Sequence, residues 1–504
     1  MVGGQSIVFH RYHEAGKTSI QRLKYNKNIK DFVKLPLGQI VKKIVGLDCN
    51  ALYLHALSQD MPTGKAEHEI IDDIKREKEI IEEAKNGKFW GFVECDAEVP
   101  EELYDYFQEF QPIVKTVEIE ETAENIGKYM FDLIKKIRGK TAKSSRRLIL
   151  SYHATKILLY VPLLLWYLEK GLNITKVYSA IHLKKYIVYK GFADFIAERR
   201  RDADSAKTDD IDDISRNAFE ASALMYKNIG NSCIGKTMID KSKQTTTKFL
   251  NEKKFNKAVQ SFRFKDAEEL KNTNGNQTDY KYEVGMYKKR NKWDNCIQVG
   301  IAVYQLAKLC VLKFVYDFID KYIPRECYQL MESDTDSLYI AFSNENMDLL
   351  VKPKLLEEYK IVKDTFLPRT DTKEHNNYDN RTPGLFKEEA RGDIMVCLCS
   401  KLYFLKSFDD SQKSHYANKG VNKNCNTDKL NIETFKKVLD SATPEMVKNN
   451  SIIYCGKKMN MTENNELLLL HRMVNITQEK KGLTPIYIKK RIDADGITCF
   501  PTFM

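Results

Sequence analysis

Residues 327–342 read CYQLMESDTDSLYIAF, with two apolar runs on either side of the acidic tetrapeptide Asp334-Thr335-Asp336-Ser337. Apolar runs joined by a tight polar turn are typical of a β-hairpin. In extended chain, side chains at i and i+2 point the same way, so both carboxylates can act together. The tetrapeptide is also a good turn sequence, because Asp and Ser side chains bond their own backbone. The tetrapeptide alone does not distinguish a catalytic acidic pair from an ordinary turn.

A second acidic residue, Asp48, ends the short apolar run 42–48 (KKIVGLD), which predicts a buried strand. Transfer of a nucleotidyl group needs two divalent ions roughly 3.5–4 Å apart, and Mg²⁺ takes hard oxygen ligands such as carboxylates. A strand end and a hairpin tip are rigid points for such ligands. The alternative is that Asp48 is an N-cap for a helix at 51–57.

A third element is the segment 227–235, KNIGNSCIG, late in a predicted helix. The apolar residues of that helix interleave with polar ones; they are Leu224, Tyr226, Ile229 and Cys233. Lys227, followed one turn later by Asn231 and Ser232, gives a polar stripe that could meet a triphosphate. The alternative is a solvated lysine near a helix end stopped by Gly235.

The remaining patterns predict an α+β core with helical attachments. Expected helices cover 72–85, 157–170 (closed by Gly171), 195–204, a stretch resuming at 215 after acidic residues 209–213, and 299–322. Expected strands cover 88–97 and 485–490, with short helical patterns in the tail from 428 onward. The polar, Lys-rich segment 245–291 has the composition of an insertion.

The bulk composition limits the class of protein. The chain has 504 residues, 42% hydrophobic, so it can bury a large core and is not disordered. Lys plus Arg exceed Asp plus Glu by 81 to 70, and this basic excess favours a polyanionic partner.

The cysteines and apolar runs indicate an intracellular protein. The eleven cysteines form no CxxC pair, and the close pair Cys397 and Cys399 lacks the further ligands of a zinc site. Reduced thiols, with no disulfide partner, are expected. The start of the chain carries no secretory signal, and the apolar stretch 157–168 is too short to span a membrane. Nuclear or viral-factory placement cannot be read from the residues.

The order of these elements resembles that of family B DNA polymerases. Residues 48–54 (DCNALYL) resemble their motif A (DxxSLYP), 227–235 resemble motif B (KxxxNSxYG), 334–337 match motif C (DTDS), and 400–403 (SKLY) resemble the KxY element that grips the primer terminus. Four motifs in the family's order make coincidence improbable.

Other phrases resemble the protein-primed branch of that family. Gly3-Gly4 followed by IVFHRYHEAGK (7–17) is similar to the YxGG region between exonuclease and polymerase parts. KILLYVPLLLWYLEKGL, PGLFKEEARGD and KGVNK are similar to polymerases of Polinton/Maverick elements and related viruses. Met1 stands where the Tyr of YxGG would be, so the chain is expected to be either a fragment or a polymerase without proofreading.

The resemblance implies a right-hand polymerase fold with palm, helical fingers and a small thumb. The implied domains are 1–60 (junction and first palm part), 61–150 (insertion, candidate first terminal-protein region), 151–240 (palm helix and fingers), 241–295 (insertion, candidate second terminal-protein region), 296–425 (palm with motif C and KxY) and 426–504 (thumb and C-terminal region).

The implied activity is template-directed DNA synthesis with two Mg²⁺ ions, for which Mn²⁺ can substitute. Partners would be a DNA primer–template, dNTPs and a terminal protein primer. Metal ligands are expected at Asp48 and Asp336, with Asp334 in support. The nucleotide-binding set, with Tyr53 as steric gate, comprises Tyr53, Leu52, Lys227, Asn231 and an arginine among Arg199, Arg200 and Arg201, of which Arg200 and Arg201 are preferred. The DNA-binding set comprises Gly3, Gly4, Ser232, Gly235, Lys401 and Tyr403.

Several positions depart from the family pattern. They are Ala51 for Ser and Leu54 for Pro in motif A, Ile234 for Tyr in motif B, and Glu332-Ser333 for Tyr-Gly before motif C. None is one of the three aspartates. They leave open a catalytically degenerate, DNA-binding remnant of such a polymerase. A reverse transcriptase is the third alternative, although those enzymes lack the KxxxNSxxG helix and the KxY strand.

Overall fold

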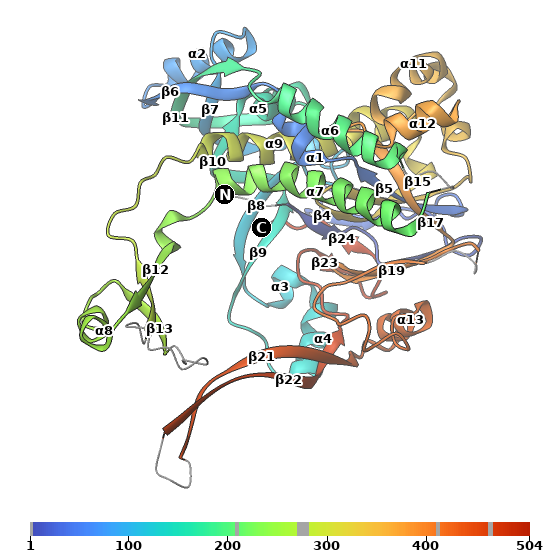
Figure 1. Ribbon diagram of the computed structural model, residues 1–504. Helices are drawn as coiled ribbons and strands as arrows, with labels where there is room; N and C mark the ends of the chain where they lie inside the picture. Colours follow the sequence, from blue (N-terminus) through green and yellow to red (C-terminus); the bar gives the residue numbers. More distant parts are fainter. Residues whose placement is uncertain (1–3, 207–210, 270–281, 410–413, 462–466, 504) are drawn as a thin grey trace.

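The computed structural model describes residues 4–206, 211–269, 282–409, 414–461 and 467–503. Gly3 lies outside the described residues, as do parts of the acidic segment 209–213 and of the polar segment 245–291. The predicted α+β composition is confirmed: helices and antiparallel sheets pack around one large apolar core (Figure 1).

A five-stranded antiparallel sheet lies at the centre, in the order β1-β15-β16-β5-β17. Its strands come from distant parts of the chain: β1 (Ser6–Val8), β5 (Lys43–Cys49), β15 (Tyr328–Asp334), β16 (Ser337–Phe342) and β17 (Phe386–Gly392). The predicted hairpin at 327–342 and strand at 42–48 are confirmed. Alternate residues enter different cores, as Val45 and Ile44 do, so both faces of the sheet are buried.

The register of this sheet brings the acidic residues to one end. Asp334 pairs with Ser6 on β1, and Asp48 pairs with Ser337 on β16 and Lys387 on β17. Three segments that are far apart in sequence therefore meet around the turn between β15 and β16.

A second sheet has the order β10-β7-β11-β6. Its elements and nearby helices are β6 (Met61–Ile70), α2 (Ile74–Lys85), β7 (Gly91–Glu98), β10 (His153–Tyr160), α5 (Val161–Glu169) and β11 (Asn173–Tyr186). The predicted helix at 72–85 and strand at 88–97 are confirmed. The boundary placed at 150/151 is wrong: it cuts strand β9 (Ser145–Ser151), and β6 and β7 pair with β11 beyond it.

The helix predicted at 157–170 is corrected at its start. Residues 157–160 complete strand β10, and α5 begins at Val161 because Pro162 occupies its first turn, where a missing N–H costs nothing. Gly171, with φ +84°, follows its C-terminal end as predicted.

Four helices surround the end of β5. They are α1 (Leu52–Leu57), α6 (Lys190–Ser205), α7 (Asp213–Thr237) and α9 (Ile297–Lys313), and α1 contacts the other three. Helices α6 and α7 form a long hairpin in green (Figure 1). Gly235 lies inside α7 rather than ending it, since Gly235 keeps a helical backbone and the helix runs on to Thr237.

The predicted helix at 299–322 is confirmed as one continuous run. Helix α9 continues through a π-helical segment, Phe314–Ile319, into α10 (Asp320–Tyr322). In the described part of the chain, Ile297–Tyr322 is the one run apolar and long enough to cross a membrane, and 67% of its most apolar window is buried inside the protein.

A third sheet has the order β2-β18-β19-β20, with strands β2 (Tyr12–Glu14), β18 (Ile394–Cys399), β19 (Leu402–Lys406) and β20 (His415–Asn418). Along residues 396–404, side chains on both faces of this sheet pack in apolar cores. Val396 and Phe404 pack in one core with helix α13 (Ile432–Ser441), and Cys397 and Tyr403 pack in another. Helix α13 covers the face that carries Val396 and Phe404.

The tail also differs from prediction. After α13, the chain forms a long hairpin, β21 (Glu445–Met461) and β22 (Leu467–Leu483), instead of short helices. Residues 485–490 form no strand. Instead, the Lys489 and Lys490 ammonium groups donate to the carbonyls of Ser6 and Glu109, at 2.8 Å each, which ties the tail to the N-terminal segment.

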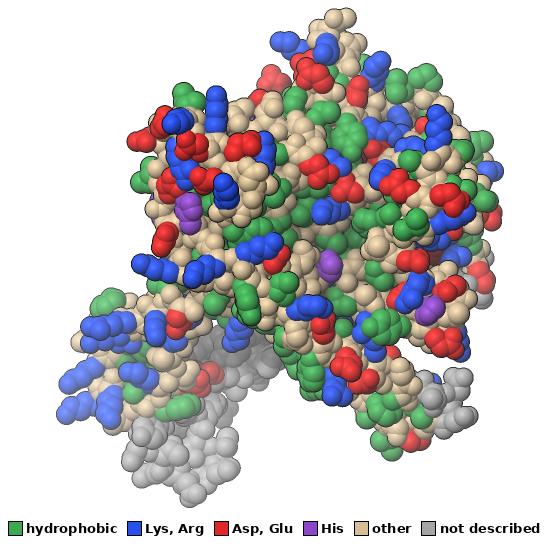
Figure 2. Space-filling view, turned by 90° about the horizontal axis from the view of Figure 1, so that it is seen from above, with side chains coloured by type: hydrophobic (Ala, Val, Ile, Leu, Met, Phe, Trp, Pro, Cys, Tyr) green, Lys and Arg blue, Asp and Glu red, His purple; other side chains and the backbone are tan. Residues whose placement is uncertain are grey.

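Residues 241–269 and 282–295 form a separate lobe, at the place where the sequence has the composition of an insertion. It contains β12 (Thr245–Leu250), α8 (Glu252–Val259), β13 (Phe264–Glu269) and β14 (Tyr282–Tyr287), in the sheet order β12-β14-β13. The lobe projects to the left of the body in Figure 1, and Lys and Arg side chains gather on that side in Figure 2.

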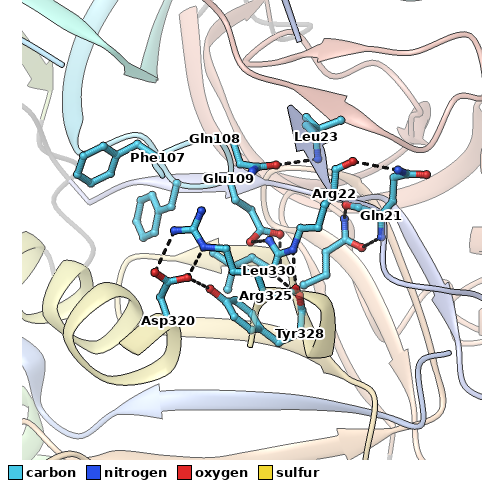
Figure 3. Close-up of polar contacts among 12 residues, drawn as sticks. Gln21, Arg22, Leu23, Phe107, Gln108, Glu109, Asp320, Arg325, Tyr328 and Leu330 are labelled. Atoms are coloured by element: carbon cyan, nitrogen blue, oxygen red, sulfur yellow. Dashed lines mark hydrogen bonds and ion pairs between the residues drawn. The ribbon is translucent and has the colours of Figure 1, made fainter. Parts of the chain in front are cut away.

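A buried polar network fixes the start of β15 (Figure 3). Arg22 pairs with Glu109 at 2.7 Å, and Glu109 accepts from the Leu330 amide at 2.8 Å. Asp320 pairs with Arg325 at 2.6 Å and accepts from the Tyr328 hydroxyl at 2.8 Å. Each charge is paired, as burial requires. The strand that ends in Asp334 is therefore anchored at its other end.

The remaining elements are short: β3 (Leu23–Asn26), β4 (Asp31–Lys34), β8 (Ile113–Ile119), α3 (Ala123–Ile126), α4 (Lys128–Arg138), α11 (Leu356–Phe366), α12 (Lys373–Asp379), β23 (Arg491–Ile492), β24 (Cys499–Phe500) and the 3-10 turns η1 (Glu101–Leu103), η2 (Lys241–Lys243), η4 (Arg325–Cys327), η5 (Met347–Leu350) and η6 (Pro353–Leu355). The ten cysteines whose side chains are described are free thiols.

Candidate functional site

The turn between β15 and β16 is very tight. The Asp336 amide donates to the Asp334 carbonyl at 2.7 Å, and the Cys49 amide donates to the Asp336 carbonyl at 2.8 Å. Thr335 at the tip has φ +62°, which is unfavourable for a β-branched residue. The turn thus holds Asp334 and Asp336 on rigid backbone and ties Asp336 to β5, directly beside Asp48.

Backbone strain gathers around this turn. Among the described residues, six non-glycine residues have positive φ, and three of them are Ala51, Thr335 and Lys401. Ala51 lies between Asp48 and helix α1, and the Lys401 ammonium contacts Asp334. Such strain persists where the surrounding structure enforces it, and it concentrates at functional sites. Ala51 is also the N-cap of α1 without a side-chain hydrogen bond, so Asp48 is not the cap of that helix.

Gly4 packs directly on the turn. The Thr335 amide donates to the Gln5 carbonyl at 2.7 Å, and a Cβ built on Gly4 would lie 2.4 Å from Thr335 Oγ1. Only a residue without a side chain leaves Thr335 in its place. The predicted DNA-binding residue Gly4 is therefore a support for the DTDS turn in this structure.

Gly4→Ala should displace Thr335, with a small change in thermal stability because the contact is local. If the carboxylates carry the primer extension expected from sequence, its rate should fall at least about tenfold. Thr335→Gly removes the clashing side chain and suits the positive φ. We therefore expect the double variant Gly4→Ala/Thr335→Gly to recover most of the lost rate. Failure of that rescue would show that Gly4 acts other than through Thr335. Steady-state primer extension and thermal melts measure both effects.

The carboxylates at this end of the sheet repel one another. Burial, followed by the charge of Asp336, raises the pKa of Asp48 to about 7. Burial is also the main cause that raises the pKa of Asp336, and Asp334 adds to it. Glu389 on β17 contributes to both shifts. A cluster of acids with raised pKa values requires cations to be fully ionised.

Lysines supply part of that positive charge. Lys401 Nζ lies 2.8 Å from Asp334 Oδ1, and Lys387 Nζ lies 4.0 Å from Asp48 Oδ2 and 2.9 Å from Glu389. Lys227, reaching in from helix α7, lowers the pKa of Asp48. Lysines from a turn, a strand and a helix therefore act on one carboxylate cluster.

The donor set suits a hard divalent cation. Mg²⁺ is typically held by one or two carboxylates together with substrate phosphates, and Asp48 and Asp336 offer such a pair. Within the described residues, no three His, Cys, Asp or Glu side chains are arranged as a finished metal site. The Asp334 carboxylate is paired with Lys401, and its expected part in metal binding stays a prediction.

Tyr53 and Leu52 follow Asp48 on helix α1 but differ in placement. The Tyr53 ring meets Tyr304 of α9 edge-on, with centroids 5.4 Å apart. Burial raises the pKa of Tyr53, and Asp336 and Asp334 contribute, which places Tyr53 beside the carboxylates. Leu52 is only 3% exposed and belongs to the core. The Leu52 side chain is therefore not available to a ligand, and only its backbone amide in the first helical turn could donate to one.

Helix α7 presents its predicted polar stripe to solvent. Lys227, Asn231, Ser232 and Gly235 are all exposed. The apolar pattern assigned to this helix is partly wrong, because Leu224 and Ile229 are 56% and 41% exposed. Gly230 and Ile234 are the buried positions instead, and Gly230 lies against Ile196 of α6 and Leu54 of α1.

The three arginines of α6 have different surroundings. Arg199 pairs with Asp202 at 3.2 Å, and Arg201 lies 3.8 Å over the Tyr378 ring and donates to Thr382 at 3.0 Å. Arg200 Nε is buried without a hydrogen-bond partner. Among the three, Arg200 is the one with a buried donor that no acceptor meets, while Arg201 ties α6 to α12.

Lys401 and Tyr403 differ in exposure, since Lys401 is half-buried and Tyr403 is buried. Lys401 is in the β18–β19 turn, beside Asp334. Tyr403 is only 4% exposed, and its hydroxyl lies 2.9 Å from that of Tyr339 on β16. Through this contact Tyr403 joins the third sheet to the central sheet, so its side chain is not available at the surface.

Three charged residues at the site were not singled out from sequence. Lys387 and Glu389 are on β17, whose register with β5 places them beside Asp48. Glu332 is fully buried between Ser6 and the Lys401 amide, and burial raises its pKa to about 8. The phrase PGLFKEEARGD contained the first two, but only the strand pairing shows which of its charges face the site.

No family model and no curated protein matches the chain. Solved structures of Phi29 DNA polymerase resemble it at low identity. The complex with primer-template DNA gives a TM-score of 0.39 at 12% identity, covering 91% of this chain and 61% of that one. The complex with single-stranded DNA gives 0.39 at 11%, covering 83% and 55%, and the orthorhombic crystal form gives 0.39 at 12%, covering 88% and 61%. This chain thus spans less than two thirds of those structures.

Proposed function

We propose that this chain is a family B, protein-primed type DNA polymerase that adds dNTPs to a primer 3′ end on a DNA template. The observation that carries the proposal is the meeting of Asp48, Asp334 and Asp336 at one end of a rigid antiparallel sheet. Tyr53 and Lys227 approach the same cluster from two different helices. This is the arrangement that the four sequence motifs require if they act together.

In the proposed reaction, Asp48 and Asp336 would hold two Mg²⁺ ions. These ions would lower the pKa of the attacking 3′-hydroxyl and neutralise the negative charge that develops on the leaving pyrophosphate. Lys227 neutralises the triphosphate, and the exposed Asn231 lines the same pocket. Tyr53, held by Tyr304, lies under the sugar and excludes a 2′-hydroxyl. Lys401 exchanges its bond to Asp334 for the primer backbone. Catalysis then comes from position and charge.

Protein priming and a Polinton-like or viral origin rest on the phrases that resemble such polymerases. The lobe at residues 241–295 is proposed as the second terminal-protein region, because it projects from the body next to helix α7. The first such region would lie within 99–150, since 61–98 is part of the second sheet. Transfer of labelled dNMP to a terminal protein hydroxyl would test this part separately.

Primer extension on a DNA template with Mg²⁺ or Mn²⁺ tests the main proposal. We expect templated incorporation of dNTPs by the wild-type chain. DNA binding without incorporation in either metal would favour the degenerate, DNA-binding remnant. A preference for an RNA template would favour a reverse transcriptase. Mg²⁺-dependent extension of DNA on DNA alone supports the proposal over both.

The raised pKa of Asp48 predicts a pH dependence of stability without metal. The folded protein holds this proton up to about pH 7, and the unfolded chain loses it near the ordinary value of 3.8. The contribution of Asp48 is therefore fully present below pH 4 and lost as pH rises through 7. Between pH 5 and 8, we expect a loss on the order of 3 kcal/mol in the free energy of unfolding.

Denaturant unfolding in a chelating buffer measures this loss. Asp48→Asn keeps the shape of the side chain and removes the titration, so its stability should depend less on pH over the same range. If the free energy of unfolding falls equally with pH in the wild type and in Asp48→Asn, the raised pKa of Asp48 is contradicted.

A further inference from the structure

A cavity of about 650 Å³ lies between helix α9 and strands β8 and β10. Its volume is in the range of about 300–1,000 Å³ that is typical of ligand sites. On α9 it is lined by Ile301, Tyr304, Gln305 and Lys308, whose spacing puts them on one helix face. Gln305 closes one end by accepting from the Tyr160 amide at 2.8 Å and donating to the Leu158 carbonyl at 2.7 Å.

The lining of this cavity is cationic. It includes Lys115, Arg146, Lys156 and Lys308, and no aspartate or glutamate. Among the described residues, no hydrogen bond or ion pair reaches the ammonium group of Lys308 or of Lys115. Burial lowers the pKa of each to about 8, and no acidic group offsets it. A desolvated cation without a counter-charge destabilises the folded protein, and a bound anion that pairs with it would offset this cost.

The apolar part of the lining is equally specific. Ile157, Leu158 and Ile301 contribute aliphatic surface, and the rings of Tyr167 and Tyr304 face the same space. Sites for single-stranded nucleic acid combine cations for the backbone with aromatic and apolar surfaces for the bases. An inorganic anion would use only the first kind of group. Lys156, which also lines the cavity, has a strained φ of +49°.

The cavity adjoins the carboxylate site through one contact. Tyr304 lines the cavity and also meets Tyr53, with ring centroids 5.4 Å apart. The cavity is thus on the α1–α9 side of the carboxylates, and Lys401 approaches Asp334 from the β18–β19 turn. A strand that pairs with the incoming nucleotide must pass on the nucleotide side, where Tyr53 lies.

We propose that this cavity binds the single-stranded template next to the nucleotide site, with Lys308 and Lys115 on its phosphodiesters and Tyr304 against a base. The inference rests on the proposed function, because it names the path of the template at the same site. Tyr304 then connects template position to Tyr53, which lies under the sugar. Binding of an unpaired strand replaces the missing counter-charge of the two lysines.

Fluorescence anisotropy without divalent ions tests the site apart from catalysis. The probes are a primer–template with a 5′ template overhang, a blunt duplex of the same primer, and dATP alone. Lys308→Met and Lys115→Met remove one charge each with similar volume. Lys354→Met removes a matched charge on the exposed turn η6 and serves as control.

We expect each cavity variant to weaken overhang binding about three- to tenfold at low salt, and to lower the salt slope by about 0.7–1. Blunt-duplex and dATP binding should change less than twofold, and Lys354→Met should change nothing. Lys308→Met should melt at the same or a higher temperature, because it removes a half-buried charge that no acidic side chain of the cavity pairs with. Lys308→Arg should retain overhang binding.

Four results would overturn the proposal. Unchanged overhang binding would remove the site, an equal loss with blunt duplex would assign the cavity to the duplex, and a loss with dATP alone would assign it to the triphosphate. The fourth result is that Lys308→Met loses thermal stability together with binding of all three probes, without recovery in Lys308→Arg. That result would show that Lys308 has a purely structural role. If the wild-type chain extends primers and the cavity variants bind the overhang normally, the template site is wrong and the polymerase function stands. If the wild-type chain binds the overhang through these lysines and does not extend primers, the polymerase function is wrong and the template site stands.

Discussion

Asp336→Asn should lower primer extension at least about 10³-fold, equivalent to about 4 kcal/mol of transition-state stabilisation. Asparagine keeps the size of the side chain but offers a neutral, weaker ligand for Mg²⁺. The tight turn should survive, because its hydrogen bonds use only the backbone of Asp334 and Asp336. The effect should therefore appear in the rate of incorporation and not in the affinity for DNA.

The same substitution should increase stability when metal is absent. Asp336 raises the pKa of Asp48, so removing its charge relieves a repulsion between buried carboxylates. We expect a higher free energy of unfolding in chelating buffer and a lower pKa for Asp48. Asp364→Asn, the same change on the exposed side of helix α11, should alter neither rate nor stability. Normal incorporation by Asp336→Asn would exclude Asp336 as a metal ligand.

Tyr53→Ala should relax discrimination against ribonucleotides about 100-fold. The ring is braced by Tyr304 and lies beside Asp334 and Asp336, so its removal opens space where a 2′-hydroxyl would otherwise clash. A clash of about 2.7 kcal/mol corresponds to this factor. The measurement is the ratio of kcat/KM for a dNTP and the matching rNTP. The rate with dNTPs should fall much less than the ratio.

Tyr53→Phe is the matched control, because it keeps the ring and removes the hydroxyl. It should discriminate almost as well as the wild type. Equal selectivity in Tyr53→Ala and wild type would leave Tyr53 as a core residue on α1, the ordinary role of a tyrosine that packs against a neighbouring helix.

Local patterns predicted much of the site. The apolar runs around residues 334–337 and the run ending at Asp48 were strong strand signals, and both strands lie where expected. Prediction failed where a tertiary contact overrides the pattern. Residues 157–160 became a strand because they pair with β7, and residues 485–490 became irregular because Lys489 and Lys490 bind backbone carbonyls. Leu224 and Ile229 have the spacing of a buried helix face, but both are exposed in the described part of the chain.

The sequence by itself determined which residues are chemically able to act: three aspartates on a strand end and a turn, a lysine on a helix, and a second lysine after β18. It could do so because acidity, turn formation and periodicity are local properties. The tertiary structure decided which other residues lie beside them. Lys387 and Glu389 reach Asp48 only through the pairing of β17 with β5, and Gly4 holds Thr335 only because β1 joins β15. Register between distant strands depends on the packing of the whole sheet, and no local pattern encodes it.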